Sequence, residues 1–216
     1  MDLGSAAGVI AGELASDGFR VKGIEYDPEL VAQWRKKNRR PAVEIIQGDG
    51  RKLPYRAEEF DGALALEVLE HIPETEQVLA ELSRVIKPGG KLVIGVPTAA
   101  TEKIYYRLNP KFAELSTHVH VFSEKELRSK LAGAGFKVYA TRGENSEYTP
   151  LWLWIALAKI PFDFTGHTTT ETLGEKLYWK GFKLLEILGL RGLVESLGNK
   201  FWPRSVYFYA VKARRQ

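Results

Sequence analysis

Hydrophobic and polar positions alternate in blocks along the first two thirds of the chain. Short apolar runs predict buried strands, and the segments between them place apolar residues at helical spacing. This strand–helix alternation predicts an α/β fold whose mostly parallel sheet has helices on both faces. The predicted helices are Ala7–Asp17, Pro28–Asn38 and Pro73–Ile86. The predicted strands are Met1–Leu3, Phe19–Glu25, Val43–Gln47, Phe60–Leu66 and Lys91–Val96.

Local signals at the helix ends support these boundaries. Asp27 is a suitable N-cap, and Pro28 fits the first helical position because it has no N–H to satisfy there. The Lys-Pro-Gly-Gly sequence at 87–90 predicts a turn that ends the helix 73–86 before the next strand begins. The apolar face of that helix consists of Val78, Leu79, Leu82, Val85 and Ile86.

The last third of the chain departs from this alternation. A polar, irregular stretch follows Pro97, and a helix is then predicted over Glu124–Ala134 and a strand over Phe136–Thr141. Ser205–Lys212 is a further predicted strand, and the roughly 60 residues before it are far too many for a hairpin loop. These residues predict a helical cap. The expected division is a sheet domain at residues 1–143, the cap at 144–204, and a final strand with a basic tail at 205–216.

Composition narrows the chemistry. The chain has no cysteine, which excludes disulfides, cysteine-ligated zinc and a thiol nucleophile. Its four histidines form no ligand-spaced pair on a predicted helix, so no metal site is expected. The net charge is +4, but the basic clusters are not interleaved with aromatics, so no nucleic-acid partner is expected. No signal peptide and no run of ~20 apolar residues is visible, which predicts a cytoplasmic location. The pattern predicts no particular oligomeric state.

The first candidate site is a glycine-rich turn between the first strand and the first helix. Residues 2–8 read Asp-Leu-Gly-Ser-Ala-Ala-Gly, and glycines there let the backbone approach a ligand closely. The N-terminus of the following helix favours negative or polar groups. Glu25 lies about 20 residues further on, at the end of the second strand, where a carboxylate can accept hydrogen bonds from ribose hydroxyls. Taken alone, such a turn also occurs in NAD-dependent enzymes and in simple tight turns.

Two further landmarks fall at the ends of later strands. Gly-Asp-Gly at 48–50 follows the third strand, and Leu-Glu-Val-Leu-Glu-His-Ile at 66–72 closes the fourth. In open α/β sheets, ligands bind at the carboxyl ends of the strands. The residues expected to ring one crevice are therefore Gly4, Glu25, Asp49 and Glu67.

The order of these motifs resembles the class I S-adenosylmethionine (SAM)-dependent methyltransferases. Within that class the chain is similar to the type 11 group, which includes the ubiquinone- and menaquinone-biosynthesis enzymes. The resemblance rests on residues 2–8, on the stretch 66–72 with Lys-Pro-Gly-Gly at 87–90, and on His-Val-Phe-Ser at 120–123. It implies a Rossmann-like three-layer sandwich with a seven-stranded sheet, whose last strand, 205–212, runs antiparallel.

The resemblance also implies SAM as the cofactor. Glu25 matches the family's ribose-binding acid, Tyr26 is expected beside the adenine, and Asp49 matches the adenine-contacting acid. The full predicted cofactor-binding set is Asp2, Gly4, Ser5, Ala6, Gly8, Glu25, Tyr26, Asp49, Gly50, Leu66 and Glu67.

Two positions depart from the family pattern. Ala6 stands where the middle glycine of the loop is usual, and almost no residues precede Asp2, so a truncated first strand is expected. The short strand favours an alternative function, a non-catalytic Rossmann-type scaffold or binding module with weak or no SAM binding. An NAD-dependent oxidoreductase is disfavoured because Glu-His-Ile and Lys-Pro-Gly-Gly have no place in it.

The expected reaction is an in-line displacement on the SAM methyl group by a small-molecule, lipid-like acceptor. Because the methyl donor is already activated, most of the catalysis consists of positioning. A general base is needed only when the attacking atom carries a proton at working pH. The candidates for such a base are His71, His118 and His120.

The cap suggests where an apolar acceptor would enter. Leu151–Ala158 is an apolar run, and a predicted helix over Leu173–Leu188 carries Lys176, Lys180 and Lys183 on one face. A basic amphipathic helix can lie in a membrane interface, so residues 150–202 predict peripheral membrane contact. The alternative is a lid whose apolar face packs on the sheet while its lysines are solvated.

Overall fold

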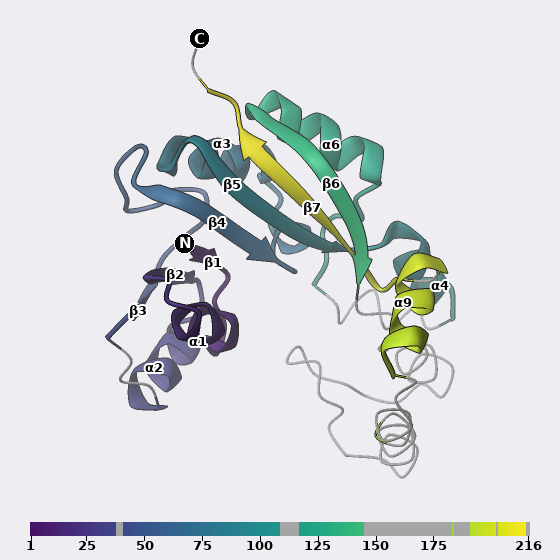
Figure 1. Ribbon diagram of the computed structural model, residues 1–216, viewed down its shortest axis with the longest axis horizontal. Helices are drawn as coiled ribbons and strands as arrows, with labels where there is room; N and C mark the ends of the chain where they lie inside the picture. Colours follow the sequence, from purple (N-terminus) through teal and green to yellow (C-terminus); the bar gives the residue numbers. More distant parts are fainter. Residues whose placement is uncertain (38–40, 109–116, 145–182, 184–190, 202, 215–216) are drawn as a thin grey trace. The chain divides into compact units, whose positions relative to one another are not determined.

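The computed structural model describes residues 1–37, 41–108, 117–144, 183, 191–201 and 203–214, shown as a ribbon in Figure 1. The helices are α1 (Val9–Ser16), α2 (Pro28–Lys37), the 3-10 turn η1 (Leu69–His71), α3 (Thr75–Val85), α4 (Ala99–Leu108), α6 (Glu124–Gly133) and α9 (Arg191–Phe201). The strands are β1 (Asp2–Leu3), β2 (Val21–Glu25), β3 (Val43–Gln47), β4 (Phe60–Leu66), β5 (Ile86–Pro97), β6 (Phe136–Glu144) and β7 (Ser205–Lys212).

Seven strands form one mixed sheet in the order β3-β2-β1-β4-β5-β7-β6. The pairs β1–β2, β2–β3, β1–β4 and β4–β5 are parallel. β7 lies between β5 and β6 and runs opposite to β6 (Figure 1). The expected Rossmann-like α/β fold with an antiparallel last strand is confirmed, and so is the short first strand.

The register of the central strands places their carboxyl ends at one level. Leu3, the last residue of β1, pairs with Ile24 of β2 and with Ala65 of β4. In the next pair of strands, Glu25 of β2 lies opposite Gln47 of β3. The loops that leave β1, β2, β3 and β4 therefore begin along the same edge of the sheet, as the sequence predicts.

Apolar residues on both faces of the central strands explain why helices cover this sheet. Three successive residues, from Gly23 to Glu25, are buried at the end of β2, although neighbouring side chains of a strand point to opposite faces. The helix α3 buries the apolar face predicted for it. One apolar cluster packs α1 and α2 on β2 and β3. The cluster consists of Ala11, Val21, Val31, Trp34, Val43 and Ile45.

The predicted junction between α3 and β5 is wrong. The Lys-Pro-Gly-Gly segment 87–90 does not form a separate turn, because α3 ends at Val85 and β5 already begins at Ile86. Ile86 pairs with Phe60, and a register shift between Phe60 and Gly62 absorbs the irregular segment, in which Gly89 has a φ of +80°. Positive φ costs glycine little, so the strand continues where the sequence indicated a break.

The stretch after Pro97, predicted to be irregular, contains the helix α4. Thr98 precedes it, and its Oγ1 accepts a hydrogen bond from the backbone N–H of Thr101 at 3.3 Å. Thr98 also donates its own backbone N–H to the carbonyl of Arg204 at 2.8 Å. Thr98 therefore caps the start of α4 and also binds Arg204, the residue just before β7.

The described residues fall into two compact units. The first comprises Met1–Val96, Glu124–Thr141 and Phe208–Gln216, and the second Pro97–Ser123 and Arg142–Tyr207. The predicted cap thus shares its unit with residues that the sequence assigned to the sheet domain, and the predicted division stays a prediction. The predicted apolar run 151–158 and, apart from Lys183, the predicted helix 173–188 lie outside the described residues. Among the described helices, none is both long and apolar enough to cross a membrane.

Gly8→Ala is expected to destabilise the first unit strongly. Gly8 has a φ of +72°, and an added Cβ would lie 2.2 Å from Cε3 of Trp34. Left-handed strain of about 1–2 kcal/mol adds to overpacking of about 1–3 kcal/mol, so the free energy of unfolding should fall by about 3 kcal/mol. Urea denaturation measures this loss.

Gly18→Ala is the matched control. Gly18 also has a positive φ, +92°, but an added Cβ meets nothing within 4 Å. This variant should lose only the strain of about 1–2 kcal/mol. Equal losses in the two variants would contradict a packing role for Gly8.

Candidate functional site

A pocket of about 440 Å³ opens at the carboxyl ends of β1 to β4, within the first unit. The four residues that the strand-end rule places around one crevice all lie in its wall. Its lining comprises Leu3, Gly4, Ala6, Ile24, Glu25, Tyr26, Leu30, Gly48, Asp49, Gly50, Arg51, Glu67, Val68, His71, Ile72 and Pro73.

The loop after β1 folds back tightly on the end of β2. The backbone N–H groups of Gly4 and Ser5 both donate to the carbonyl of Ile24, at 2.8 and 3.1 Å. Gly4 has a φ of +74°, and a Cβ at that position would lie 2.3 Å from Cγ2 of Val68. Ala6 also has a positive φ, +43°, which strains an alanine by about 1 kcal/mol or more. The strained backbone of Ala6 thus lies in the wall of the pocket.

Glu25 fixes this loop through its carboxylate. The side chain comes from the last residue of β2 and is only 8% exposed. Its Oε2 accepts the backbone N–H of Ala6 at 2.7 Å, and its Oε1 accepts that of Asp27 at 2.9 Å. Because both oxygens bind backbone groups, the plane of the carboxylate is set by the loop after β1 and by the start of α2. Each oxygen retains acceptor capacity for a ligand hydroxyl.

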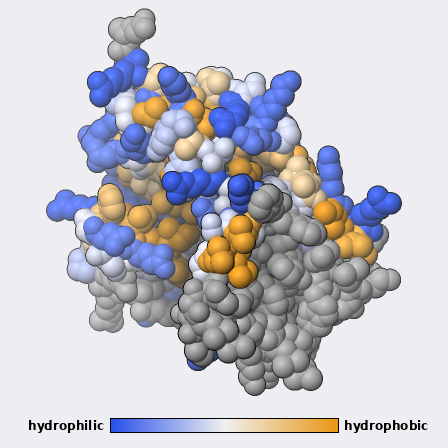
Figure 2. All heavy atoms as spheres, turned by 45° about the vertical axis from the view of Figure 1, so that its right-hand side comes forward, coloured by the Kyte–Doolittle hydropathy of each residue, from blue (hydrophilic) through white to orange (hydrophobic). Residues whose placement is uncertain are grey.

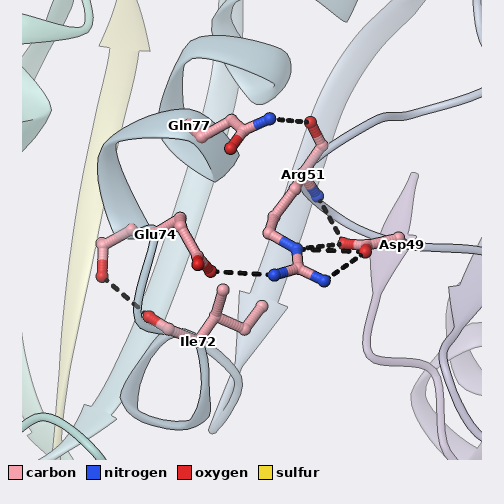
Figure 3. A network of polar contacts seen from close by, with 6 residues as sticks. Asp49, Arg51, Ile72, Glu74 and Gln77 are labelled. Carbon is pink, nitrogen blue, oxygen red and sulfur yellow. Dashed lines mark hydrogen bonds and ion pairs between the residues drawn. The ribbon is translucent and has the colours of Figure 1, made fainter.

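Arg51 links the loops after β3 and β4 at the pocket wall, as Figure 3 shows. Its Nε and Nη2 donate to the carboxylate of Asp49, the shortest contact being 2.7 Å, and its Nη1 donates to Oε2 of Glu74 at 2.9 Å. The backbone N–H of Arg51 also donates to Oδ1 of Asp49 at 2.9 Å. The hydrogen bonds from Arg51 lower the pKa of Asp49 below its ordinary value.

The segment that follows Asp49 is anchored along α3. Glu81 accepts the backbone N–H of Leu53 at 2.7 Å. Arg84 donates to the carbonyls of Leu53 and Tyr55, at 3.0 and 2.7 Å, and is itself paired with Glu81. The side chain of Gln77 donates to the carbonyl of Arg51 at 3.1 Å. The loop therefore has a fixed course although it contains no helix or strand of its own.

The end of β4 supplies a second strained residue. Glu67 has a φ of +55°, and its backbone N–H donates to the carbonyl of Gly95 at 2.9 Å. His71, at the end of η1, lines the same pocket with a partly exposed side chain. The pocket wall thus carries three carboxylates, those of Glu25, Asp49 and Glu67, against the single guanidinium of Arg51. This balance favours a ligand with cationic groups.

Asp2 is a buried carboxylate next to the glycine loop. It is 2% exposed, and its Oδ2 has no hydrogen-bond partner among the described residues. Burial raises its pKa to about 6, because the charged form loses its hydration, and the charge of Glu25 acts in the same direction. A buried carboxylate oxygen that has no hydrogen-bond partner among the described residues costs stability.

Four of the predicted cofactor residues do not line the pocket. Asp2 and Leu66 lie within strands, Ser5 donates its hydroxyl to the carbonyl of Asp2 at 2.9 Å, and Gly8 packs against Trp34. Their predicted cofactor contacts stay predictions. Several lining residues next to the sequence motifs were not predicted, and of these Arg51 was detectable as a cation two positions after Asp49. The missed residues are Leu3, Ile24, Leu30, Gly48, Arg51, Val68, Ile72 and Pro73.

The other two candidate bases belong to the second unit. Nδ1 of His118 lies 2.9 Å from Oε2 of the buried Glu102, which also accepts the hydroxyl of Tyr106. With Glu102 ionised, this contact places a proton on Nδ1 and leaves Nε2 as the basic nitrogen of a neutral ring. The ring of His120 lies 5.3 Å from that of Phe122. The geometry suits a base at His118 better than at His120, and the catalytic role of all three histidines stays a prediction.

Comparisons with known proteins agree with this geometry. Residues 1–94 match the family described as a methyltransferase domain. A demethylmenaquinone methyltransferase of Corynebacterium kroppenstedtii is 33% identical over 94 residues, covering 44% of this chain and 39% of the relative. A phosphatidylethanolamine N-methyltransferase of Cereibacter sphaeroides is 34% identical over 105 residues, covering 44% and 52%. The chain thus spans about half or less of the length of these relatives.

The similarity to a solved structure covers more of the chain. The SAM-dependent methyltransferase of Mesorhizobium loti aligns with a TM-score of 0.64 and 14% identity. The alignment covers 98% of this chain and 89% of that protein. At this identity the likeness shows the fold alone.

The buried carboxylate of Asp2 predicts a pH-dependent stability. Its pKa is about 6 in the folded chain and about 4 when exposed, so folding favours the protonated form. The free energy of unfolding should therefore fall as the pH rises from about 4 to about 6 and then level off. A shift of about two pKa units corresponds to at most about 3 kcal/mol.

Asp2→Asn removes this titration. The variant should be more stable than the wild type at pH 7.5, by about 1–3 kcal/mol, and the difference should shrink towards pH 4. Urea denaturation at both pH values measures it, with the exposed Asp17→Asn at the end of α1 as the control. A variant that is less stable than the wild type at pH 7.5 would contradict the inferred cost of the buried charge.

Proposed function

This chain belongs to the class I SAM-dependent methyltransferases of the type 11 group, and we propose that its pocket binds SAM for methyl transfer to a small-molecule acceptor. Family membership implies SAM as the cofactor. The observation that carries the proposal is the carboxylate of Glu25, held at the strand edge beside a glycine-rich loop. A fixed carboxylate there suits the two hydroxyls of a ribose.

The remaining residues of the pocket fit the cofactor. Gly4 leaves room where a side chain would meet Val68, so the backbone can approach the ligand. Beside the pocket, the buried Oδ2 of Asp2 has no hydrogen-bond partner among the described residues, and a cationic ammonium group of the cofactor's methionine part is a suitable one. The carboxylates in the wall also suit the sulfonium charge.

The protein's contribution to the reaction is mainly positioning. Bound SAM supplies an activated methyl group, so the chain needs to orient donor and acceptor and to exclude water. An acceptor that carries a proton also needs a base, and the candidates remain His71, which lines the pocket, His118 and His120. An acceptor with an available lone pair at working pH needs none.

Glu25→Ala is expected to weaken binding of S-adenosylhomocysteine, the demethylated cofactor. The loss of both hydroxyl contacts and of the fixed loop should cost about 1–3 kcal/mol, or roughly a tenfold to hundredfold rise in Kd. Isothermal titration calorimetry measures it, with Glu13→Ala on the exposed side of α1 as the control. If the folded wild-type chain gives no binding heat with submillimolar ligand, the scaffold alternative is favoured instead.

We further propose that the acceptor is lipid-like and that the protein works at the cytoplasmic surface of a membrane. Two similar proteins are named for methylation of demethylmenaquinone and of phosphatidylethanolamine. The described part of the second unit exposes apolar side chains on α9, including Leu193, which is 58% exposed. Figure 2 shows hydrophobic side chains at the surface among hydrophilic ones. The residues concerned on α9 are Leu193, Val194 and Leu197.

Membrane contact through α9 predicts co-sedimentation with anionic liposomes. Binding should be stronger with anionic than with neutral lipid and should weaken as salt rises. The double variant Leu193→Glu/Leu197→Glu should release the protein into the supernatant, because both changes place charges on the exposed apolar face of α9. Val9→Glu, at an exposed apolar position of α1, is the matched control. A wild-type protein that stays in the supernatant at low salt contradicts the proposal.

A further inference from the structure

Arg51 bridges two carboxylates at the wall of the pocket (Figure 3). Asp49, on the loop after β3, receives the Nε and Nη2 hydrogens, and Glu74, just before α3, receives an Nη1 hydrogen. The backbone carbonyl of Arg51 is held in turn by Gln77. The guanidinium is therefore held between the carboxylates of Asp49 and Glu74, and the backbone of Arg51 is held by Gln77.

This bridge contributes little to stability. The side chains of Arg51, Asp49 and Glu74 are 37%, 36% and 47% exposed, and ion pairs in such surroundings contribute at most about 1 kcal/mol. The loop already has stronger anchors in Glu81 and Arg84. What the bridge does fix is the orientation of one carboxylate, because the planar guanidinium binds it through two nitrogens.

The contacts occupy one edge of the Asp49 carboxylate. Oδ1 accepts the backbone N–H of Arg51, and Oδ2 accepts Nη2, while Nε lies within 3.1 Å of both oxygens. A carboxylate has about four acceptor positions, so capacity remains for a further donor. The guanidinium also keeps this carboxyl ionised, since its hydrogen bonds lower the pKa of Asp49. The group presented at the pocket is thus a pure acceptor in a fixed plane.

We propose that Arg51 is a positioning residue that sets the purine specificity of the pocket by holding Asp49 ready to accept the exocyclic amino group of adenine. The inference rests on the proposed function, because it needs the cofactor in this pocket. A purine with a 6-oxo group presents an acceptor to the ionised carboxylate and is repelled. Without Arg51, Asp49 can turn away, and both the attraction and the repulsion weaken.

The test compares S-adenosylhomocysteine with S-inosylhomocysteine, in which a 6-oxo group replaces the 6-amino group and N1 carries a hydrogen. Their Kd values are measured by isothermal titration calorimetry for the wild type, Arg51→Met and Lys52→Met. Lys52→Met removes a neighbouring cation of the same loop whose side chain is not part of the bridge. Asp49→Ala gives the discrimination that remains without the carboxylate.

The wild type should bind the adenine ligand at least tenfold more tightly than the hypoxanthine ligand. Arg51→Met should reduce this ratio severalfold towards that of Asp49→Ala, mainly through weaker adenine binding, while Lys52→Met leaves the ratio unchanged. The thermal midpoint of the ligand-free Arg51→Met variant should stay within a few degrees of the wild type.

Four outcomes overturn the inference. Unchanged affinities for both ligands in Arg51→Met show that Asp49 needs no positioning, and an equal fold loss for both ligands, which leaves the ratio unchanged, shows a general electrostatic effect. An equal reduction of the ratio in Lys52→Met shows that charge in the loop, rather than the bridge, is responsible. A wild type that binds neither ligand overturns the proposed function, and this inference with it. A wild type that binds S-adenosylhomocysteine but gives one of the outcomes above overturns this inference alone.

Discussion

The hydrogen bonds from backbone N–H groups to the carboxylate of Glu25 organise the site. One oxygen holds Ala6 in the loop after β1, and the other holds Asp27 at the start of α2. Because Gly4 and Ser5 also donate to the end of β2, three successive N–H groups of the loop are bound there. A single buried carboxylate therefore decides the course of the loop, the entry to the helix and the acceptor that a ligand meets.

Much of this arrangement was predictable from the sequence. Short segments rich in apolar residues predicted β3, β4 and β7 at their observed bounds, because strands of a covered sheet are rich in such residues. The rule that ligands bind at the carboxyl ends of parallel strands then placed Glu25, Asp49 and Glu67 in one pocket wall. Such predictions succeed where the local sequence pattern and the topology of the sheet place a residue at the same position.

The wrong or missing predictions concern features that depend on residues distant in the chain or on weak local signals. Pro and Gly at 87–90 predict a turn between helix and strand, yet pairing with β4 through a register shift keeps these residues in β5. The helix α4 was missed because its N-cap, Thr98, is followed by few strongly apolar positions. The role of Arg51 depends on Glu74, which is 23 residues away in the chain and near only in space. The local sequence does not indicate such long-range partners.

The anchoring of the 51–58 segment on α3 has a thermodynamic consequence for any ligand of the pocket. Glu81 and Arg84 bind its backbone directly, so the segment loses its conformational freedom when the chain folds. A ligand that packs against this wall does not have to order it again. Contact of a ligand with Arg51 therefore carries no entropic cost for ordering this segment.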